Sequence, residues 1–202
     1  MAMIDLFMSS ATLALPATRS EPMECPDVLV LPGYGGSGPR HWQTLWETSH
    51  PRFRRVNQRD WHFPVCREWV ETLEEAVAQT GGRPVLVAHS LACLTVAHWA
   101  VSSRLKIAGA LLVAPPDPEG PQFPQQASGF HPIPMRPFPF KGVVVASSND
   151  PYGSVGFARR HAEAWGAEFV DAGPVGHINS ESGLDHWPEG FCLLKKLMTQ
   201  TY

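Results

Sequence analysis

Long apolar runs are absent from this sequence of 202 residues, in which no stretch reaches about 18 apolar residues. A helix that crosses a membrane is therefore not expected. Neither sign of charge dominates, because 16 lysines and arginines stand against 19 aspartates and glutamates, a formal net charge of -3. This balance gives no electrostatic reason to expect nucleic acid or an anionic membrane surface as a partner.

Cysteine is scarce, with four residues at wide spacing and no Cys-x-x-Cys pair. They are Cys25, Cys66, Cys93 and Cys192. Apolar surroundings around three of them predict buried thiols and argue against a disulfide or zinc framework. Such thiols favour a reducing compartment, so a cytoplasmic protein is expected. His41 and His62 lack acidic or thiol partners at metal-ligand spacing, and no metal site is expected.

The first 20 residues lack the basic start and the uninterrupted apolar segment of a secretory signal. Asp5 precedes the apolar stretch, and hydroxyl residues interrupt it. We therefore expect residues 1–24 to be an N-terminal extension and residues 25–202 to form a single domain. Hydrophobic residues make up 44% of the chain and charged residues 17%, a balance typical of a folded soluble domain.

Short apolar runs alternate with helical patterns along the rest of the chain. Six runs are typical of strands, at residues 28–31, 53–57, 84–88, 110–114, 143–146 and 168–170. Apolar residues recur at three- and four-residue steps within residues 66–77, 91–101, 158–165 and 191–198, and Pro64 suits a first helical position. Alternating units of this kind predict an α/β fold with a mostly parallel six-stranded sheet and helices on both faces.

One segment, residues 115–140, breaks this alternation and holds nine of the chain's 20 prolines. Proline removes a backbone donor and clashes inside helices, so a helical lid is not expected here. We predict an irregular excursion over the carboxyl end of the sheet. Long connections of this kind are often functional, although a passive surface loop is an equally good interpretation.

Ser90 lies in Ala88-His89-Ser90-Leu91-Ala92, which follows a predicted strand and begins a predicted helix. A nucleophile at such a strand-to-helix turn projects its hydroxyl above the sheet. The turn needs small residues two positions before and after the serine, and both are alanine here where glycine is usual. A helix N-cap would also explain a serine at this place.

The base that a serine nucleophile needs is expected at His177, in Gly176-His177-Ile178-Asn179, a few residues after the last predicted strand. The adjacent glycine permits a close approach of the backbone. His186 is the alternative base, near the start of the last predicted helix. His89 adjoins Ser90, but we expect it to pack within the fold.

The acid that orients the base is expected at Asp150, which follows the predicted strand at residues 143–146. An ordinary Asn-Asp-Pro turn would also explain it. Asp117 and Asp171 follow two other predicted strands and are the alternatives. Ligands of parallel α/β sheets bind beyond the carboxyl ends of the strands, and the chain order Ser, Asp, His is that of α/β-hydrolases.

The oxyanion formed in acyl transfer needs preorganised donors. We expect one at the backbone N–H of Leu91. The other is expected in the glycine-rich turn at residues 32–38, at Tyr34 N–H first and Gly35 N–H second. A phosphate-binding loop is the competing interpretation of this turn, but its Gly-Lys-Ser/Thr ending is missing.

From about Asp27 onward, the chain resembles the small serine hydrolases related to retinoblastoma-binding protein nine, a compact branch of the α/β-hydrolases. The resemblance rests on Leu31-Pro32-Gly33 with Trp42 and Trp46, Asp60-Trp61 with Pro64 and Trp69, His89-Ser90, Asn149-Asp150-Pro151-Tyr152, and Gly176-His177-Ile178-Asn179 with Ser182-Gly183. It implies a six-stranded parallel sheet without a large cap domain, esterase or peptidase-like activity, and Ser90, Asp150 and His177 as catalytic residues. No Leu-x-Cys-x-Glu segment is present, so binding of the retinoblastoma protein is not carried over.

The sequence thus predicts a serine hydrolase that cleaves a small ester or amide through an acyl-enzyme and requires no cofactor. The alternative is a catalytically silent binding protein on an α/β-hydrolase scaffold, because fold does not fix function. The Pro-x-x-Pro stretch from Pro121 to Pro124 suits that alternative.

Overall fold

A six-stranded parallel sheet forms the centre of the computed structural model, which describes residues 26–201. The strands are β1 (Val28–Leu31), β2 (Phe53–Arg55), β3 (Val85–His89), β4 (Gly109–Val113), β5 (Lys141–Ala146) and β6 (Glu168–Asp171). Their order across the sheet is β2-β1-β3-β4-β5-β6, and every neighbouring pair is parallel. The predicted sheet is confirmed, whereas the predicted extension at residues 1–24 lies outside the described residues.

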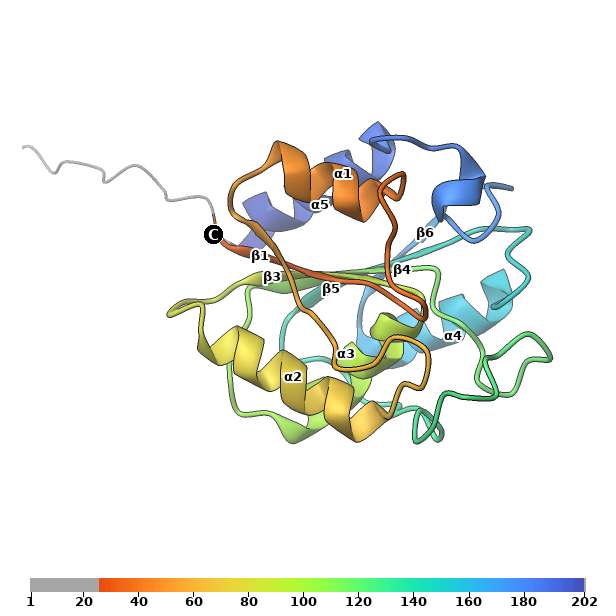
Figure 1. Ribbon diagram of the computed structural model, residues 1–202, viewed down its shortest axis with the longest axis horizontal. Helices are drawn as coiled ribbons and strands as arrows, with labels where there is room; N and C mark the ends of the chain where they lie inside the picture. The colour runs from red at the N-terminus through yellow and green to blue at the C-terminus, as the bar shows by residue number, and fades with distance from the viewer. Residues whose placement is uncertain (1–25, 202) are drawn as a thin grey trace, which may run out of the picture.

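Helices cover both faces of the sheet (Figure 1). One layer holds α1 (Trp42–Ser49) and α5 (Pro188–Thr201), and the other holds α2 (Cys66–Ala78), α3 (Leu91–Ser102) and α4 (Val155–Trp165). A short 3-10 helix, η1 (Ser180–Ser182), precedes α5. Within the described part of the chain, no helix is long and apolar enough to cross a membrane.

Two helix starts differ from the sequence-based expectation. Helix α1 was not among the predicted helices, because its eight residues give only about two turns of apolar periodicity. Its start is fixed by the side chain of His41, which accepts a hydrogen bond from the Gln43 N–H. Helix α2 begins at Cys66 with Val65 as its N-cap, so Pro64 precedes the helix instead of occupying its first position.

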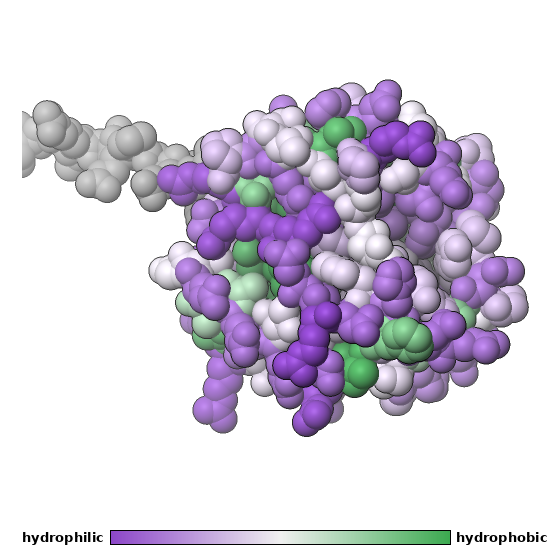
Figure 2. Space-filling view, viewed as in Figure 1, coloured by the Kyte–Doolittle hydropathy of each residue, from purple (hydrophilic) through white to green (hydrophobic). Residues whose placement is uncertain are grey.

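Successive strand residues face opposite helix layers, as the twofold period of a strand requires. Leu29, Leu86 and Leu112 pack with α2, α3 and α4, whereas Val28 and Val85 pack with α1 and α5. Because both faces are covered, the strands are apolar at nearly every position. On the molecular surface seen in Figure 2, apolar residues form only small patches among hydrophilic ones.

The proline-rich segment at residues 115–140 contains neither helix nor strand, as predicted. Only its first part lies near the carboxyl end of β4. Phe130 is buried against Trp69, with ring centroids 6.0 Å apart, and Trp165 Nε1 donates to the Pro134 carbonyl at 2.8 Å. The rest of the segment therefore runs along the layer of α2, α3 and α4 to the start of β5. The predicted excursion over the carboxyl end of the sheet describes only its first part.

The cysteines follow the expectation of buried thiols in part. Cys66 and Cys93 are buried and free, and burial raises the pKa of the Cys66 thiol to about 12. Burial raises the pKa of Cys93 still further. Both are therefore protonated at neutral pH and poor nucleophiles. Cys192 is free but exposed on α5, so the expectation of a buried thiol was wrong for this residue. Cys25 lies outside the described residues.

Candidate active site

Three loops at the carboxyl ends of β3, β5 and β6 bring together Ser90, Asp150 and His177. His177 Nε2 lies 2.8 Å from Ser90 Oγ. His177 Nδ1 lies 2.9 Å from each carboxylate oxygen of Asp150. The three side chains form one continuous hydrogen-bonded chain, because the carboxyl ends of parallel strands meet at the same edge of a sheet.

Ser90 has an unusual backbone conformation, with φ 56 and ψ -127. Non-glycine residues in such regions typically carry about 1–3 kcal/mol of strain that surrounding contacts must offset. The Ser90 N–H donates to the Val113 carbonyl at 2.8 Å, and the Ser90 carbonyl accepts from the Cys93 N–H at 2.9 Å. The side chain makes no capping hydrogen bond to α3, so the N-cap interpretation of this serine does not describe its hydroxyl.

The hydrogen bonds fix the tautomer of His177. A carboxylate only accepts, so Nδ1 carries the hydrogen toward Asp150 and Nε2 is left to accept from the Ser90 hydroxyl. The Asp150 side chain is only 2% exposed and also accepts from the Tyr152 N–H at 2.9 Å. The Tyr152 ring packs beside the imidazole of His177 at 4.4 Å between centroids. This arrangement can take a proton from the serine.

The loop that carries His177 (residues 172–179) is fastened to the loop after β5. Asn149 Oδ1 accepts from the Gly176 N–H at 2.6 Å, and Ser147 Oγ accepts from the Val175 N–H at 3.0 Å. These contacts set the distance between the loops of Asp150 and His177. From the sequence, Asn149 has no role beyond its place in the Asn149-Asp150-Pro151-Tyr152 block, although a run of polar residues directly before the expected acid is a usable signal.

The alternative base and acids lie elsewhere. His186 is exposed, and its backbone carbonyl accepts from Trp46 Nε1 at 2.6 Å. Asp117 Oδ1 accepts from the Glu119 N–H and Asp171 Oδ1 from the Gly173 N–H, so both carboxylates stabilise turns. Neither is bonded to the imidazole of His177.

The loop between β1 and α1 (residues 32–41) passes directly over Ser90. A Cβ atom at Gly33 would lie 2.7 Å from Ser90 Cβ and 2.9 Å from the His89 carbonyl, so only glycine fits. Among the described residues, the N–H groups of Tyr34 and Leu91 have no hydrogen-bond partner. The Gly35 N–H donates to the Trp61 carbonyl at 2.9 Å and is not available, which removes the second choice made from the sequence.

Gln43 clamps this loop to the sheet. Its side chain is fully buried, and Nε2 donates to the carbonyls of Leu31 at 3.1 Å and Val87 at 3.0 Å. Its Oε1 accepts from Ser37 Oγ at 2.7 Å. Because Leu31 ends β1 and Val87 leads to Ser90, one amide fixes the loop relative to the nucleophile's strand.

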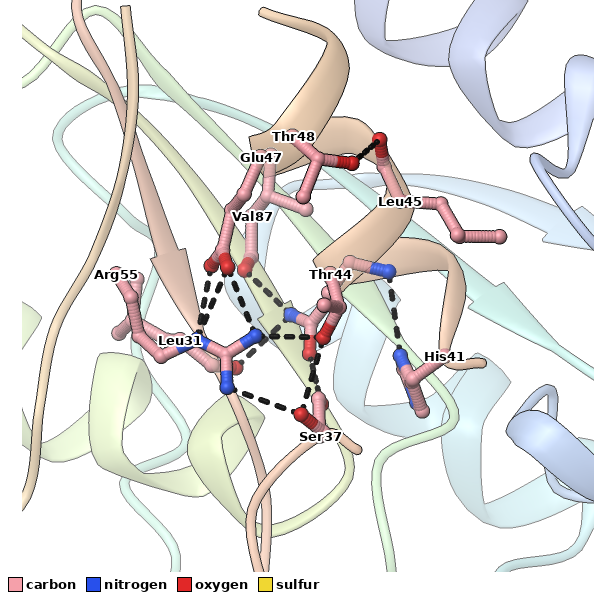
Figure 3. Close-up of polar contacts among 10 residues, drawn as sticks. Leu31, Ser37, His41, Thr44, Leu45, Glu47, Thr48, Arg55 and Val87 are labelled. Carbon is pink, nitrogen blue, oxygen red and sulfur yellow. Dashed lines mark hydrogen bonds and ion pairs between the residues drawn. The ribbon is translucent and has the colours of Figure 1, made fainter. Parts of the chain in front are cut away.

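An ionic network holds the same loop from the outer side (Figure 3). Arg55 donates to Glu47, to Thr44 Oγ1 at 2.7 Å and to the Ser37 carbonyl at 2.9 Å. Its Nη2 lies 2.8 Å from Glu47 Oε2, and both side chains are mostly buried. The backbone around Tyr34 is therefore restrained by side chains from α1 and β2.

A cavity of about 320 Å³ opens beside these groups, with Ser90 and His177 in its wall. Pro116 and Pro124 line it, so the start of the proline-rich segment contributes to the site, and Tyr152 lines it as well. Its volume lies at the lower end of the range of small-molecule sites. Within residues 26–201, no three His, Cys, Asp or Glu side chains are grouped to hold a metal ion.

Comparison with known proteins identifies the family. The model of the serine hydrolase family matches residues 28–196. The chain belongs to the serine hydrolase family. Among curated proteins, the comparison gives no match.

Solved structures confirm the α/β-hydrolase fold of this serine hydrolase. A YdeN-like hydrolase from Pectobacterium atrosepticum is 30% identical, with a TM-score of 0.77 over 86% of this chain and 91% of that one. The ydeN gene product from B. subtilis is 19% identical, with a TM-score of 0.66 over 86% and 99%. A monoacylglycerol lipase from Paleococcus ferrophilus is 13% identical, with a TM-score of 0.64 over 86% and 95%. The last two support the fold alone.

Two further imidazoles of the hydrolase, those of His41 and His89, are almost fully buried and line the same cavity as His177. The His41 and His89 rings lie 4.7 Å apart, and His89 lies 5.0 Å from His177, measured between centroids. Burial lowers the pKa of His41 to about 4, with smaller contributions from Arg55 and His177. Burial, followed by His41 and His177, lowers the pKa of His89 well below its ordinary value. Both rings are therefore uncharged at neutral pH.

Acid should destabilise the fold through His41. The pKa of this imidazole is 6.5 in the unfolded reference and about 4 when folded, so the unfolded chain binds more protons between these values. Stability should fall as the pH drops below the unfolded value, by roughly 2–3 kcal/mol at pH 4.5 from this group. Urea unfolding at pH 7 and 4.5 should show a smaller loss in His41→Gln than in the wild type. An equal loss would contradict this assignment.

Proposed function

We propose that this serine hydrolase cleaves a small ester or amide by acyl transfer, with Ser90 as nucleophile, His177 as general base and Asp150 as the acid that orients the base. One observation carries the proposal: the unbroken hydrogen-bonded chain from Ser90 Oγ through His177 to Asp150 at the wall of a cavity. The requirement for such a catalyst is a nucleophile, a base within reach of its proton, and a group that holds the base.

In the first step, Ser90 Oγ attacks the carbonyl carbon of the substrate while its proton passes to His177 Nε2. The buried carboxylate of Asp150 stabilises the imidazolium that forms. The tetrahedral intermediate then collapses, and His177 gives the proton to the departing alcohol or amine. His177 Nε2 then takes a proton from a water molecule that attacks the Ser90 ester. When the second tetrahedral intermediate collapses, His177 passes this proton to Ser90 Oγ, which releases the carboxylic acid and free Ser90.

The negative charge on the carbonyl oxygen is held by the N–H groups of Leu91 and Tyr34. Leu91 is the first residue of α3, where backbone N–H groups have no partner within the helix. Gly33 brings the Tyr34 peptide close to the nucleophile, because a Cβ atom at Gly33 would lie only 2.7 Å from Ser90 Cβ. Each such donor typically contributes about 3 kcal/mol to lowering the barrier.

Replacing Gly33 by alanine should therefore lower kcat by roughly 100- to 1,000-fold, the effect of losing one oxyanion donor. The new Cβ would meet Ser90 Cβ and a backbone carbonyl, so the loop would have to move away. Gly82→Ala is the matched control, since a Cβ there meets no atom within 4 Å. Steady-state hydrolysis of p-nitrophenyl acetate checks both variants. A Gly33→Ala enzyme with wild-type kcat would exclude this loop from the oxyanion site.

The walls of the cavity disfavour an anionic acyl group. The described residues that line it include Glu181 and no lysine or arginine, so an anionic acyl chain would meet a like charge and no cationic partner. A panel of p-nitrophenyl esters and aminoacyl amides distinguishes esterase from amidase or peptidase activity. We expect hydrolysis of short uncharged acyl esters.

The kinship with relatives of retinoblastoma-binding protein nine stays a prediction that rests on the sequence motifs.

A fluorophosphonate probe tests the function against the alternative of a silent binding protein. An activated serine attacks the phosphorus and becomes covalently labelled, whereas a serine without a working base does not react. We expect stoichiometric labelling of the folded wild-type protein and none after heat denaturation. Absence of labelling together with absence of ester hydrolysis would favour the binding protein.

A further inference from the structure

His89 is a buried imidazole that the proposed chemistry leaves without a role. It ends β3, precedes Ser90 and is only 4% exposed. Its Nε2 lies 2.9 Å from the backbone carbonyl of His177. A carbonyl only accepts, so Nε2 carries the hydrogen and donates it. His89, which adjoins the nucleophile Ser90, thus bonds directly to the backbone of His177, 88 positions later in the sequence.

The backbone that His89 holds is in an uncommon conformation. Ile178 has φ 49, a left-handed value that a β-branched residue rarely adopts. Its carbonyl accepts from Trp42 Nε1 at 2.8 Å, so two side chains hold two consecutive carbonyls of the His177 loop. The strain in this loop means that it would relax if a donor were lost.

We infer that His89 is a positioning residue, whose Nε2–H holds the His177 carbonyl so that the imidazole of His177 stays in line with Ser90 Oγ. The inference rests on the proposed function of Ser90 and His177. Because His89 directly precedes Ser90, this hydrogen bond ties the distance between Ser90 and His177 to one short contact. A misplacement of about 1 Å between reacting groups can cost on the order of 100-fold in rate.

An uncharged donor suits this place. Because His89 is neutral, it adds no positive charge beside the imidazolium that His177 becomes during the reaction, with the two rings 5.0 Å apart. A lysine or arginine donor would disfavour that imidazolium.

Two substitutions separate positioning from packing. His89→Leu gives an apolar side chain without a hydrogen-bond donor, whereas His89→Gln offers an amide N–H near the place of Nε2. His89→Leu should lower kcat for p-nitrophenyl acetate by roughly 10- to 100-fold with KM little changed, and His89→Gln should recover most of the loss. His98→Leu is the matched control, because His98 Nε2 also bonds a carbonyl, that of Phe130 at 3.3 Å, away from the site. It should leave kcat unchanged.

A second measurement does not depend on turnover. Proton NMR follows the hydrogen on His177 Nδ1, which the Asp150 hydrogen bond shields from solvent. Its exchange should be faster in His89→Leu than in the wild type and in His98→Leu. An unchanged exchange rate, an unchanged kcat in an active enzyme, or a His89→Gln variant as slow as His89→Leu would overturn the inference. A wild type that neither hydrolyses esters nor labels would instead overturn the proposed function.

Discussion

Replacing Ser90 by alanine is expected to lower kcat for p-nitrophenyl acetate by roughly 10,000-fold or more. The substitution removes only the hydroxyl that bonds His177 at 2.8 Å. Without it, no acyl-enzyme can form, and the remaining acceleration comes from substrate binding and the oxyanion donors. The fold should survive, because serine and alanine both place one Cβ at this strained position.

Steady-state kinetics and a thermal unfolding curve measure these two effects on the same preparation. Ser102→Ala is the matched control, since Ser102 lies at the far end of α3 and bonds only backbone carbonyls of its own helix. We expect wild-type activity from it. A folded Ser90→Ala variant that retains more than a small fraction of wild-type activity would mean that another group attacks the substrate.

Replacing Asp150 by asparagine is expected to lower kcat by roughly 10,000-fold, with little change in shape. An amide can turn its NH₂ toward His177 Nδ1, which would place the imidazole hydrogen on Nε2, where it could no longer accept the Ser90 proton. An amide also cannot stabilise the imidazolium as a buried carboxylate does. Kinetics from pH 5 to 9 would show the loss at every pH.

The matched controls for this variant are Asp117→Asn and Asp171→Asn, the two acids that the sequence offered as alternatives. Their carboxylates bond turn N–H groups, and neither is bonded to His177, so activity should change less than about 2-fold while stability falls slightly. Loss of activity in either control, with Asp150→Asn still active, would assign the orienting role to a different carboxylate.

Most of the sheet could be predicted because its strands are covered on both faces and are therefore apolar throughout. The predicted limits of the strands at residues 28–31, 84–88 and 110–114 differ from β1, β3 and β4 by one residue at most. Edge strand β2 is shorter than predicted, Phe53–Arg55, and pairs with β1 alone. Helix α1 has too few turns for its periodicity to stand out from the glycine-rich loop before it.

The convergence of Ser90, Asp150 and His177 could be predicted for a topological reason, since each follows a parallel strand. The contacts that hold them in place could not. Gln43 bonds a carbonyl 44 positions away, and His89, expected only to pack, bonds one 88 positions away. Such bonds depend on how distant segments pack in three dimensions, and no local pattern encodes them. The same holds for the Gly35 N–H, which a carbonyl of another loop occupies.

The central claim is that Ser90 carries the acyl group between the two steps. Rapid mixing with a slowly deacylating p-nitrophenyl ester, acid quenching within milliseconds, and mass spectrometry of the resulting peptides test it directly. We predict a mass increase equal to the acyl group on the peptide that contains Ser90, formed together with a burst of p-nitrophenol and absent from Ser90→Ala. Turnover without any acylated peptide, or with the acyl group on another residue, would contradict the account.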